Sequence, residues 1–157
     1  MKFYSRLDLV EEPAFITFWS YVHLLSGLLL FVLVSYSVKR LTGRDLVPWI
    51  AIMVASGIHA LYECKDVYYS YIAKKRPENS NSYQNSIGDQ LCASVGMLIG
   101  YLTIGTSCTP RDLLAVTIAY FNVYLLAGTM NHESLDTVSG SAEESCGASS
   151  IGDQKSD

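Results

Sequence analysis

A long, largely apolar run from Phe15 to Val38 constrains the fold of this chain more than any other feature. As an α-helix the run would extend about 36 Å, enough to cross a hydrocarbon core of roughly 30 Å. The residues before it carry acids as well as bases, whereas a cleavable signal peptide has a basic leader and a shorter apolar core. We therefore expect a short N-terminal segment, residues 1–14, and then a retained transmembrane helix.

Three further segments have the length and composition of membrane helices. Asp45 and Pro48 fit the N-cap and the first turn of the second helix, and Thr109 and Pro110 fit the N-cap and first position of the fourth. The predicted transmembrane helices are 15–38, 46–72, 87–105 and 111–130. The expected fold class is therefore all-α, a polytopic membrane protein with four transmembrane helices in an antiparallel bundle.

Charged residues are scarce and unevenly placed. They make up 17% of the chain, while hydrophobic residues make up 50%. Segment 131–157 is acidic and rich in Ser and Gly, a composition too polar to bury a core, so we predict a disordered tail. No basic patch with interleaved aromatic residues is present, which argues against a nucleic-acid partner. The expected partners are membrane lipids and, in a homo-oligomer, further copies of this chain.

Charge placement also predicts the topology. With four spans both termini lie on one side, together with the polar loop at 74–86. Lys and Arg are slightly more numerous on that side, which favours a multi-pass protein with cytoplasmic termini. The four cysteines form no CxxC pair, so we expect neither a cysteine zinc site nor a disulfide framework.

Two polar clusters interrupt the apolar segments, and each lies on one face of its helix. His59, Glu63 and Asp66 are spaced i, i+4, i+7, and Asn85 and Asp89 are spaced i, i+4. A carboxylate at membrane depth costs roughly 2.5–3.5 kcal/mol, so it needs a compensating role. Counting along each helix puts Glu63 and Asp89 about 10 Å from the midplane, toward the termini. We therefore predict one polar site in that half of the bundle.

The predicted catalytic residues of this site are His59, Glu63 and Asp89. The predicted binding residues are Asn85, Ser86, Asp66 and His23. A structural alternative stays open, in which these polar groups only fix helix packing. One imidazole with two carboxylates suits iron, manganese or zinc. Because the spacing provides no second well-placed His, we expect no metal and no cofactor.

A small-residue element follows the second cluster. Gly96 and Gly100 form a GxxxG pair, which lets a neighbouring helix approach closely. We expect this crossing to hold Asp89 against the second helix.

Three sequence elements carry a family resemblance. The segment His59-Ala-Leu-Tyr-Glu63, the segment Asn85-Ser-Ile-Gly-Asp89 and the glycine pair resemble the VanZ-like membrane proteins. They resemble still more a group of small bacterial inner-membrane proteins of unknown function. VanZ-like proteins usually have an Asn where this chain has Ala93. The resemblance is confined to the second and third helices with their loop, and it implies a membrane fold with a polar site but no particular reaction.

Three functions are compatible with such a site. An enzyme acting on a lipid or lipid-linked substrate would use His59 as general acid or base, oriented by Glu63. A small transporter or proton-coupled carrier would use the same groups as a relay and would need to oligomerise. A non-catalytic scaffold would use them to fix helix register. Of these we rank the lipid enzyme first and keep the other two as alternatives, so the sequence leaves open whether the protein is an enzyme.

Overall fold

The computed structural model describes residues 2–4, 14–69 and 82–148, and in this part of the chain it is helical apart from one short pair of strands. The strands are β1 (Lys2–Tyr4) and β2 (Ala14–Ile16), which pair in parallel. The helices are α1 (Trp19–Thr42), α2 (Pro48–Val67), α3 (Tyr83–Thr103) and α4 (Pro110–Ala148). The predicted all-α fold class is confirmed.

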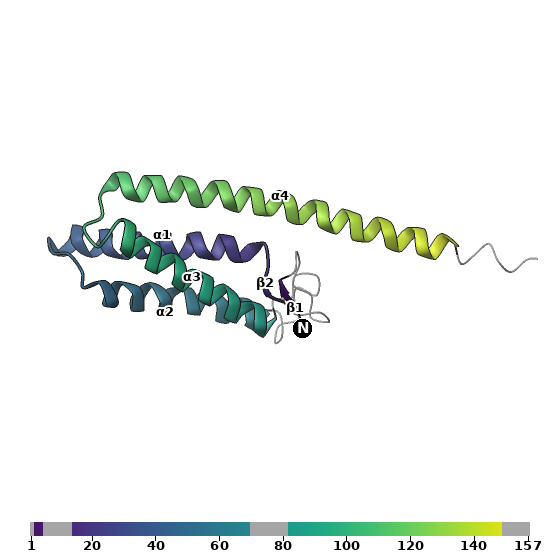
Figure 1. Ribbon diagram of the computed structural model, residues 1–157, viewed down its shortest axis with the longest axis horizontal. Helices are drawn as coiled ribbons and strands as arrows, with labels where there is room; N and C mark the ends of the chain where they lie inside the picture. Colours follow the sequence, from purple (N-terminus) through teal and green to yellow (C-terminus); the bar gives the residue numbers. More distant parts are fainter. Residues whose placement is uncertain (1, 5–13, 70–81, 149–157) are drawn as a thin grey trace, which may run out of the picture.

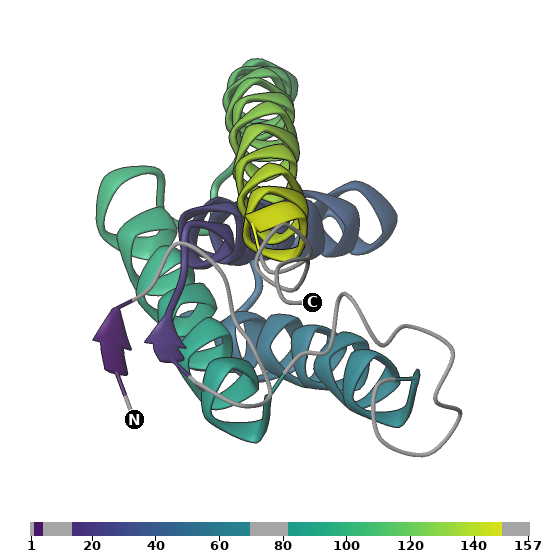
Figure 2. The same cartoon turned by 90° about the vertical axis from the view of Figure 1, so that its right-hand side faces the viewer.

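Helix α1 is the centre of the molecule and packs against each of the other three helices. Figure 2 shows α1 between α4 on one side and α2 with α3 on the other. In Figure 1, α4 runs alongside α1 and then projects well beyond the rest of the bundle. The apolar core fills the half of the bundle nearer the α1–α2 and α3–α4 connections, and it includes Phe31, Val32, Ala51, Ala55 and Met97.

Local chemistry sets the helix ends in this half. Gly43 ends α1 in the left-handed region with φ 71°, which Gly adopts without a Cβ penalty. The predicted cap of α4 is confirmed, because Thr109 Oγ1 accepts the N–H of Asp112 at 3.3 Å and the Asp112 carboxylate accepts the N–H of Thr109 at 2.8 Å. The prediction that Asp45 caps α2 is wrong, since Val47 occupies that position.

Asp45 instead ties the two connections together. Ser107 Oγ donates to its carboxylate at 2.8 Å, and Lys39 Nζ lies 3.1 Å from it. Both contacts favour the charged form, and the Ser107 hydrogen bond in particular holds the pKa of Asp45 below its usual value.

Helix boundaries differ from the prediction at the other end of the bundle. Helix α1 begins at Trp19 rather than at residue 15, because the β-formers Phe15 and Ile16 belong to β2. Helix α3 begins at Tyr83 rather than at residue 87, because the Ser82 side chain caps it by accepting the Asn85 N–H at 3.1 Å.

One further boundary concerns the predicted polar tail. Helix α4 continues to Ala148, so residues 131–148 are helical where a disordered tail was predicted. Extending an existing helix adds one hydrogen bond per residue without a new nucleus, and no proline interrupts this stretch. The rest of the predicted tail, 149–157, and segment 70–81 lie outside the described residues.

The closest helix contact joins α3 to α1. A Cβ added to Gly27 would lie 2.6 Å from the carbonyl carbon of Ala93, and one added to Gly96 would lie 2.8 Å from that of Leu24. The two backbones therefore touch, which requires Gly at both positions. The prediction that the glycine pair presses α3 onto α2 is wrong, because the facing helix is α1.

Two of the described helices are long and apolar enough to cross a membrane, α1 and the part of α4 from Pro110 to Thr129. This is weak evidence for insertion by itself. Helices α2 and α3 span 20 and 21 residues, but they carry the polar residues of the predicted site.

Candidate functional site

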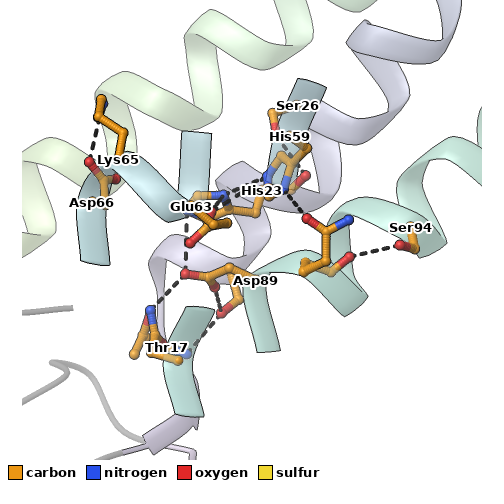
Figure 3. Close-up of polar contacts among 12 residues, drawn as sticks. Thr17, His23, Ser26, His59, Glu63, Lys65, Asp66, Asp89 and Ser94 are labelled. Carbon is orange, nitrogen blue, oxygen red and sulfur yellow. Dashed lines mark hydrogen bonds and ion pairs between the residues drawn. The ribbon is translucent and has the colours of Figure 1, made fainter. Parts of the chain in front are cut away.

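Four ionisable side chains from three helices meet in the half of the bundle that lies toward β2 (Figure 3). His23 comes from α1, His59 and Glu63 come from α2, and Asp89 comes from α3. His23 Nδ1 lies 3.0 Å from His59 Nε2 and 3.2 Å from Glu63 Oε1. Its other nitrogen, Nε2, lies 3.4 Å from Asp89 Oδ2. His23 therefore occupies the centre and connects the α2 residues to α3.

These groups are withdrawn from the surface. His59, Glu63 and Asp89 are 3%, 5% and 1% exposed, and the side chain of His23 is 14% exposed. Burying charge is costly unless the groups are paired and hydrogen-bonded. His23 is thus the most accessible member of the cluster and the first that an approaching molecule would meet.

Gln90 fixes the orientation of His59. The amide nitrogen of Gln90 donates to Ser56 Oγ at 2.8 Å and also faces the Ser56 carbonyl oxygen at 3.5 Å. The amide oxygen of Gln90 therefore faces His59 Nδ1, at 2.8 Å. An amide oxygen only accepts, so Nδ1 carries the proton and Nε2 presents its lone pair to His23 and Glu63.

Asp89 is held by donors from two sides. Ser20 Oγ donates to Oδ1 at 2.5 Å, and Asn85 Nδ2 donates to Oδ2 at 2.6 Å. Ser20 Oγ in turn accepts the backbone N–H of Thr17 at 3.0 Å. Asp89 thereby links the start of α1 to the first turns of α3, and its second oxygen is directed at His23.

The predicted site residues separate into two groups. The network includes the predicted catalytic residues together with two of the predicted binding residues, Asn85 and His23. Asp66 lies outside it and pairs with its neighbour Lys65 at 3.1 Å, away from the cluster (Figure 3). Asp66 stands one residue before the end of α2, where its side chain is 24% exposed and pairs with Lys65 instead of entering the network. Ser86 is buried in the first turn of α3, next to Asn85.

Sequence reasoning missed Ser20 and Gln90. Ser20 stands one turn before His23 on α1, and that i, i+3 spacing was an available signal. Gln90 follows Asp89 directly and so points about 100° away from it around α3. Because α3 packs against both α1 and α2, Asp89 faces the first and Gln90 faces the second. A one-face analysis of α3 leaves Gln90 out.

Aromatic side chains border the site. The ring of Tyr62 lies 6.3 Å from that of His23 and 6.5 Å from that of His59, centroid to centroid. Tyr62 is also half exposed. On the neighbouring helices, Tyr124 makes an edge contact with Trp19 at 5.7 Å. Lys65 Nζ lies 3.9 Å from the centroid of the Tyr62 ring. The outer approach to the cluster is therefore aromatic, with a charged side chain beside it.

Three members of the cluster form a set of potential metal ligands. One ligand atom each from His23, His59 and Glu63 lies within 4.8 Å of the other two. The reason for expecting no metal was the lack of a second well-placed His, and His23 supplies that residue.

No protein-family model, no curated protein and no solved structure matches this chain.

Proposed function

We propose that this chain is a four-span integral membrane protein whose buried polar site acts on a membrane lipid or a lipid-linked substrate. One observation carries the proposal. Two imidazoles and two carboxylates are buried in contact with one another, inside a bundle whose outer faces are strongly apolar.

The outer surface supports membrane insertion of all four helices. Large apolar side chains are exposed on α2, α3 and α4, among them Met53 at 65%, Leu61 at 73%, Leu102 at 71% and Leu125 at 65%. Soluble monomers rarely expose continuous apolar surface on this scale. Helices α2 and α3 are about 30 Å long, matching a hydrocarbon core, and their site residues point inward. The predicted cytoplasmic location of the termini belongs to the same proposal.

The depth of the site fits an amphipathic substrate. His23 follows the start of α1 by four residues, Glu63 precedes the end of α2 by four, and Asp89 follows the start of α3 by six. At 1.5 Å per residue the three side chains lie roughly 6–9 Å inside the helix ends. With the helix ends at the edge of the hydrocarbon core, this is about 6–9 Å below the level at which lipid headgroups join their chains. A substrate would therefore enter the bundle with its headgroup bond to reach the cluster, while its apolar tail stays in the membrane.

The pairing of groups fits proton transfer. Each imidazole lies next to at least one carboxylate, and imidazoles and carboxylates are the usual general acids and bases of enzymes. Gln90 orients His59 by accepting a hydrogen bond from its Nδ1 atom. The Nε2 atom of His59 is thereby available as a base. Asp89 stabilises the charge that His23 acquires when it accepts a proton.

The opposite half of the bundle argues against a carrier. A transporter needs a polar route through the whole membrane. Beyond the site, the described interior is filled by apolar side chains such as Phe31, Val32 and Met97, each fully buried, and Ser35 is the one buried polar side chain there in the described residues. The remaining alternative is a scaffold in which the cluster only fixes packing.

Isosteric variants distinguish an enzyme from a scaffold. Glu63→Gln and Asp89→Asn keep size but remove charge, and Asp66→Asn is a matched control on α2 outside the network. Each protein is reconstituted into vesicles of mixed glycerophospholipids with a polyprenyl phosphate, and products are followed by lipid mass spectrometry. We expect the wild type and the control to convert a lipid, and the two site variants to lose about 10²–10⁴-fold in rate.

Thermal unfolding of the same variants completes the test. If the cluster is only structural, the wild type converts no lipid and the neutral isosteres are as stable as the wild type or more so. That combination would overturn the enzymatic proposal.

A further inference from the structure

We infer that His23, His59 and Glu63 form a binding site for one divalent transition-metal ion. The three ligand atoms are His23 Nδ1, His59 Nε2 and Glu63 Oε1, and the edges of their triangle are 3.0, 3.2 and 3.8 Å. The circle through these three atoms has a radius of about 2.0 Å, which matches Zn–N and Zn–O bond lengths of roughly 2.0–2.2 Å. One ion placed near the centre would thus be in bonding range of all three atoms without rearrangement.

The two imidazoles face each other through His23 Nδ1 and His59 Nε2. His59 Nδ1 donates to Gln90, so His59 Nε2 has no proton when the ring is neutral. His23 Nε2 lies 3.4 Å from the Asp89 carboxylate, and His23 Nδ1 lies 3.2 Å from the Glu63 carboxylate. With its proton on Nε2 the His23 ring presents Nδ1 as an acceptor, and with its proton on Nδ1 it donates to His59 Nε2. Two acceptor nitrogens 3.0 Å apart repel unless a cation lies between them. That cation is either a proton or a metal ion.

Glu63 favours the metal ion over the proton. A shared proton satisfies two atoms in a line, whereas here a carboxylate oxygen closes a triangle with both nitrogens. Three anionic or lone-pair atoms arranged around one point are the usual protein contribution to a metal site.

The surrounding contacts are those of a metal site as well. A metal-bound His typically gives its other ring N–H to a carboxylate or a carbonyl oxygen, which fixes its tautomer. His59 has the Gln90 amide oxygen in that place at 2.8 Å, and His23 has the Asp89 carboxylate at 3.4 Å. Both of these partners are themselves held, Gln90 by Ser56 and Asp89 by Ser20 and Asn85.

The donor set indicates the kind of ion. Two imidazoles with one carboxylate suit zinc, and also ferrous iron or manganese, better than magnesium or calcium. Three protein ligands leave a further position for water, whose pKa a zinc ion lowers to about 7. The binding of the ion follows from this geometry alone, whereas its use in lipid chemistry rests on the function proposed above. With the ion bound, His59 and Glu63 are ligands and its water replaces them as the base.

The test uses the full chain, purified in detergent with an affinity tag that contains no histidine. The chelated protein is titrated with Zn²⁺, Mn²⁺, Co²⁺ and, under anaerobic conditions, Fe²⁺, and bound metal is measured by mass spectrometry. Visible absorption of the Co²⁺ form reports nitrogen and oxygen coordination. We expect one ion per chain and a higher melting temperature with the ion. His23→Gln and Glu63→Gln should weaken binding at least about 100-fold, and Asp66→Asn should bind like the wild type.

The titration of the wild type tests the metal site even if a variant does not fold. Less than a tenth of an ion per chain and no thermal shift with all four metals would overturn the inference and leave a shared proton in the site. Unchanged binding in a folded Glu63→Gln protein would overturn it as well. One ion per chain without lipid conversion would leave the metal site standing and sink the lipid proposal. Lipid conversion by a protein that binds no ion would overturn the metal site and leave the lipid proposal standing.

Discussion

Replacing Gly27 by Ala tests whether backbone contact between α1 and α3 builds the site. The new Cβ would lie 2.6 Å from the carbonyl carbon of Ala93, whereas carbon atoms in ordinary contact are about 3.5–4.0 Å apart. The two helices must therefore separate by about 1 Å. Overpacking of this kind costs typically 1–3 kcal/mol, and the upper end applies because backbone rather than a flexible side chain must move. The better helix propensity of Ala returns about 1 kcal/mol. We expect Gly27→Ala to be less stable than the wild type by about 1–2 kcal/mol.

Gly57→Ala is the matched control, because a Cβ at Gly57 meets no atom within 4 Å. That substitution should stabilise the protein by roughly 0.5–1 kcal/mol through helix propensity alone. Equilibrium unfolding in mixed micelles, followed by circular dichroism, measures both variants. The separation of α1 from α3 should also lengthen the 3.4 Å approach of His23 to Asp89 and so weaken metal binding in Gly27→Ala only. Equal stability of the two variants would refute the argument from backbone contact.

Three further predictions concern the partner of His59, the Asp45 contacts and the membrane topology. Gln90→Leu should weaken metal binding about 10- to 100-fold, since the His it orients loses its outer partner; competition with a chelator measures this, and unchanged affinity would contradict it. Ser107→Ala should raise the pKa of Asp45 toward its ordinary value, which NMR titration would measure. Because the pKa of Asp45 is lower in the folded state, Asp45 stabilises the wild type above its unfolded-state pKa. That stabilisation is lost as the pH falls through the folded-state pKa. In a background without the native cysteines, Cys at Gly43 and Cys at Tyr83 should react with an impermeant reagent from opposite sides of the membrane; labelling from one side would break the four-span topology.

Sequence reasoning predicted the helical architecture because its signals are local. Apolar length, capping residues and Pro positions locate α1 to α4, and the i, i+4 spacing of His59 and Glu63 puts both on one face of α2. The approach of this face to Asp89 followed from the cost of burying charge. These inferences needed no knowledge of which helix packs against which.

Predicting His23 as the centre of the site would have required knowing which helices pack together. A single His on an apolar helix is most often a packing residue, so His23 was assigned a binding role only. Its place between Glu63 and Asp89 follows from the close packing of α1 on α3, where Gly27 meets the backbone of Ala93 and Gly96 meets that of Leu24. The GxxxG spacing indicates that some helix approaches closely, but it does not indicate which helix. The identity of the facing helix is a property of the whole bundle, and the second His of a metal site became visible only with it.

Under the proposed four-span topology, the polarity of α2 and α3 has a consequence for how the chain would enter a membrane. Neither helix is as apolar as α1, and each carries one buried carboxylate that lipid would not tolerate, Glu63 on α2 and Asp89 on α3. Helix α1 comes first in the chain and offers His23 and Ser20 to those carboxylates. In the proposed four-span protein, insertion of the middle helices and assembly of the site are then one event. A chain that fails to form the site would in that case keep α2 and α3 outside the bilayer.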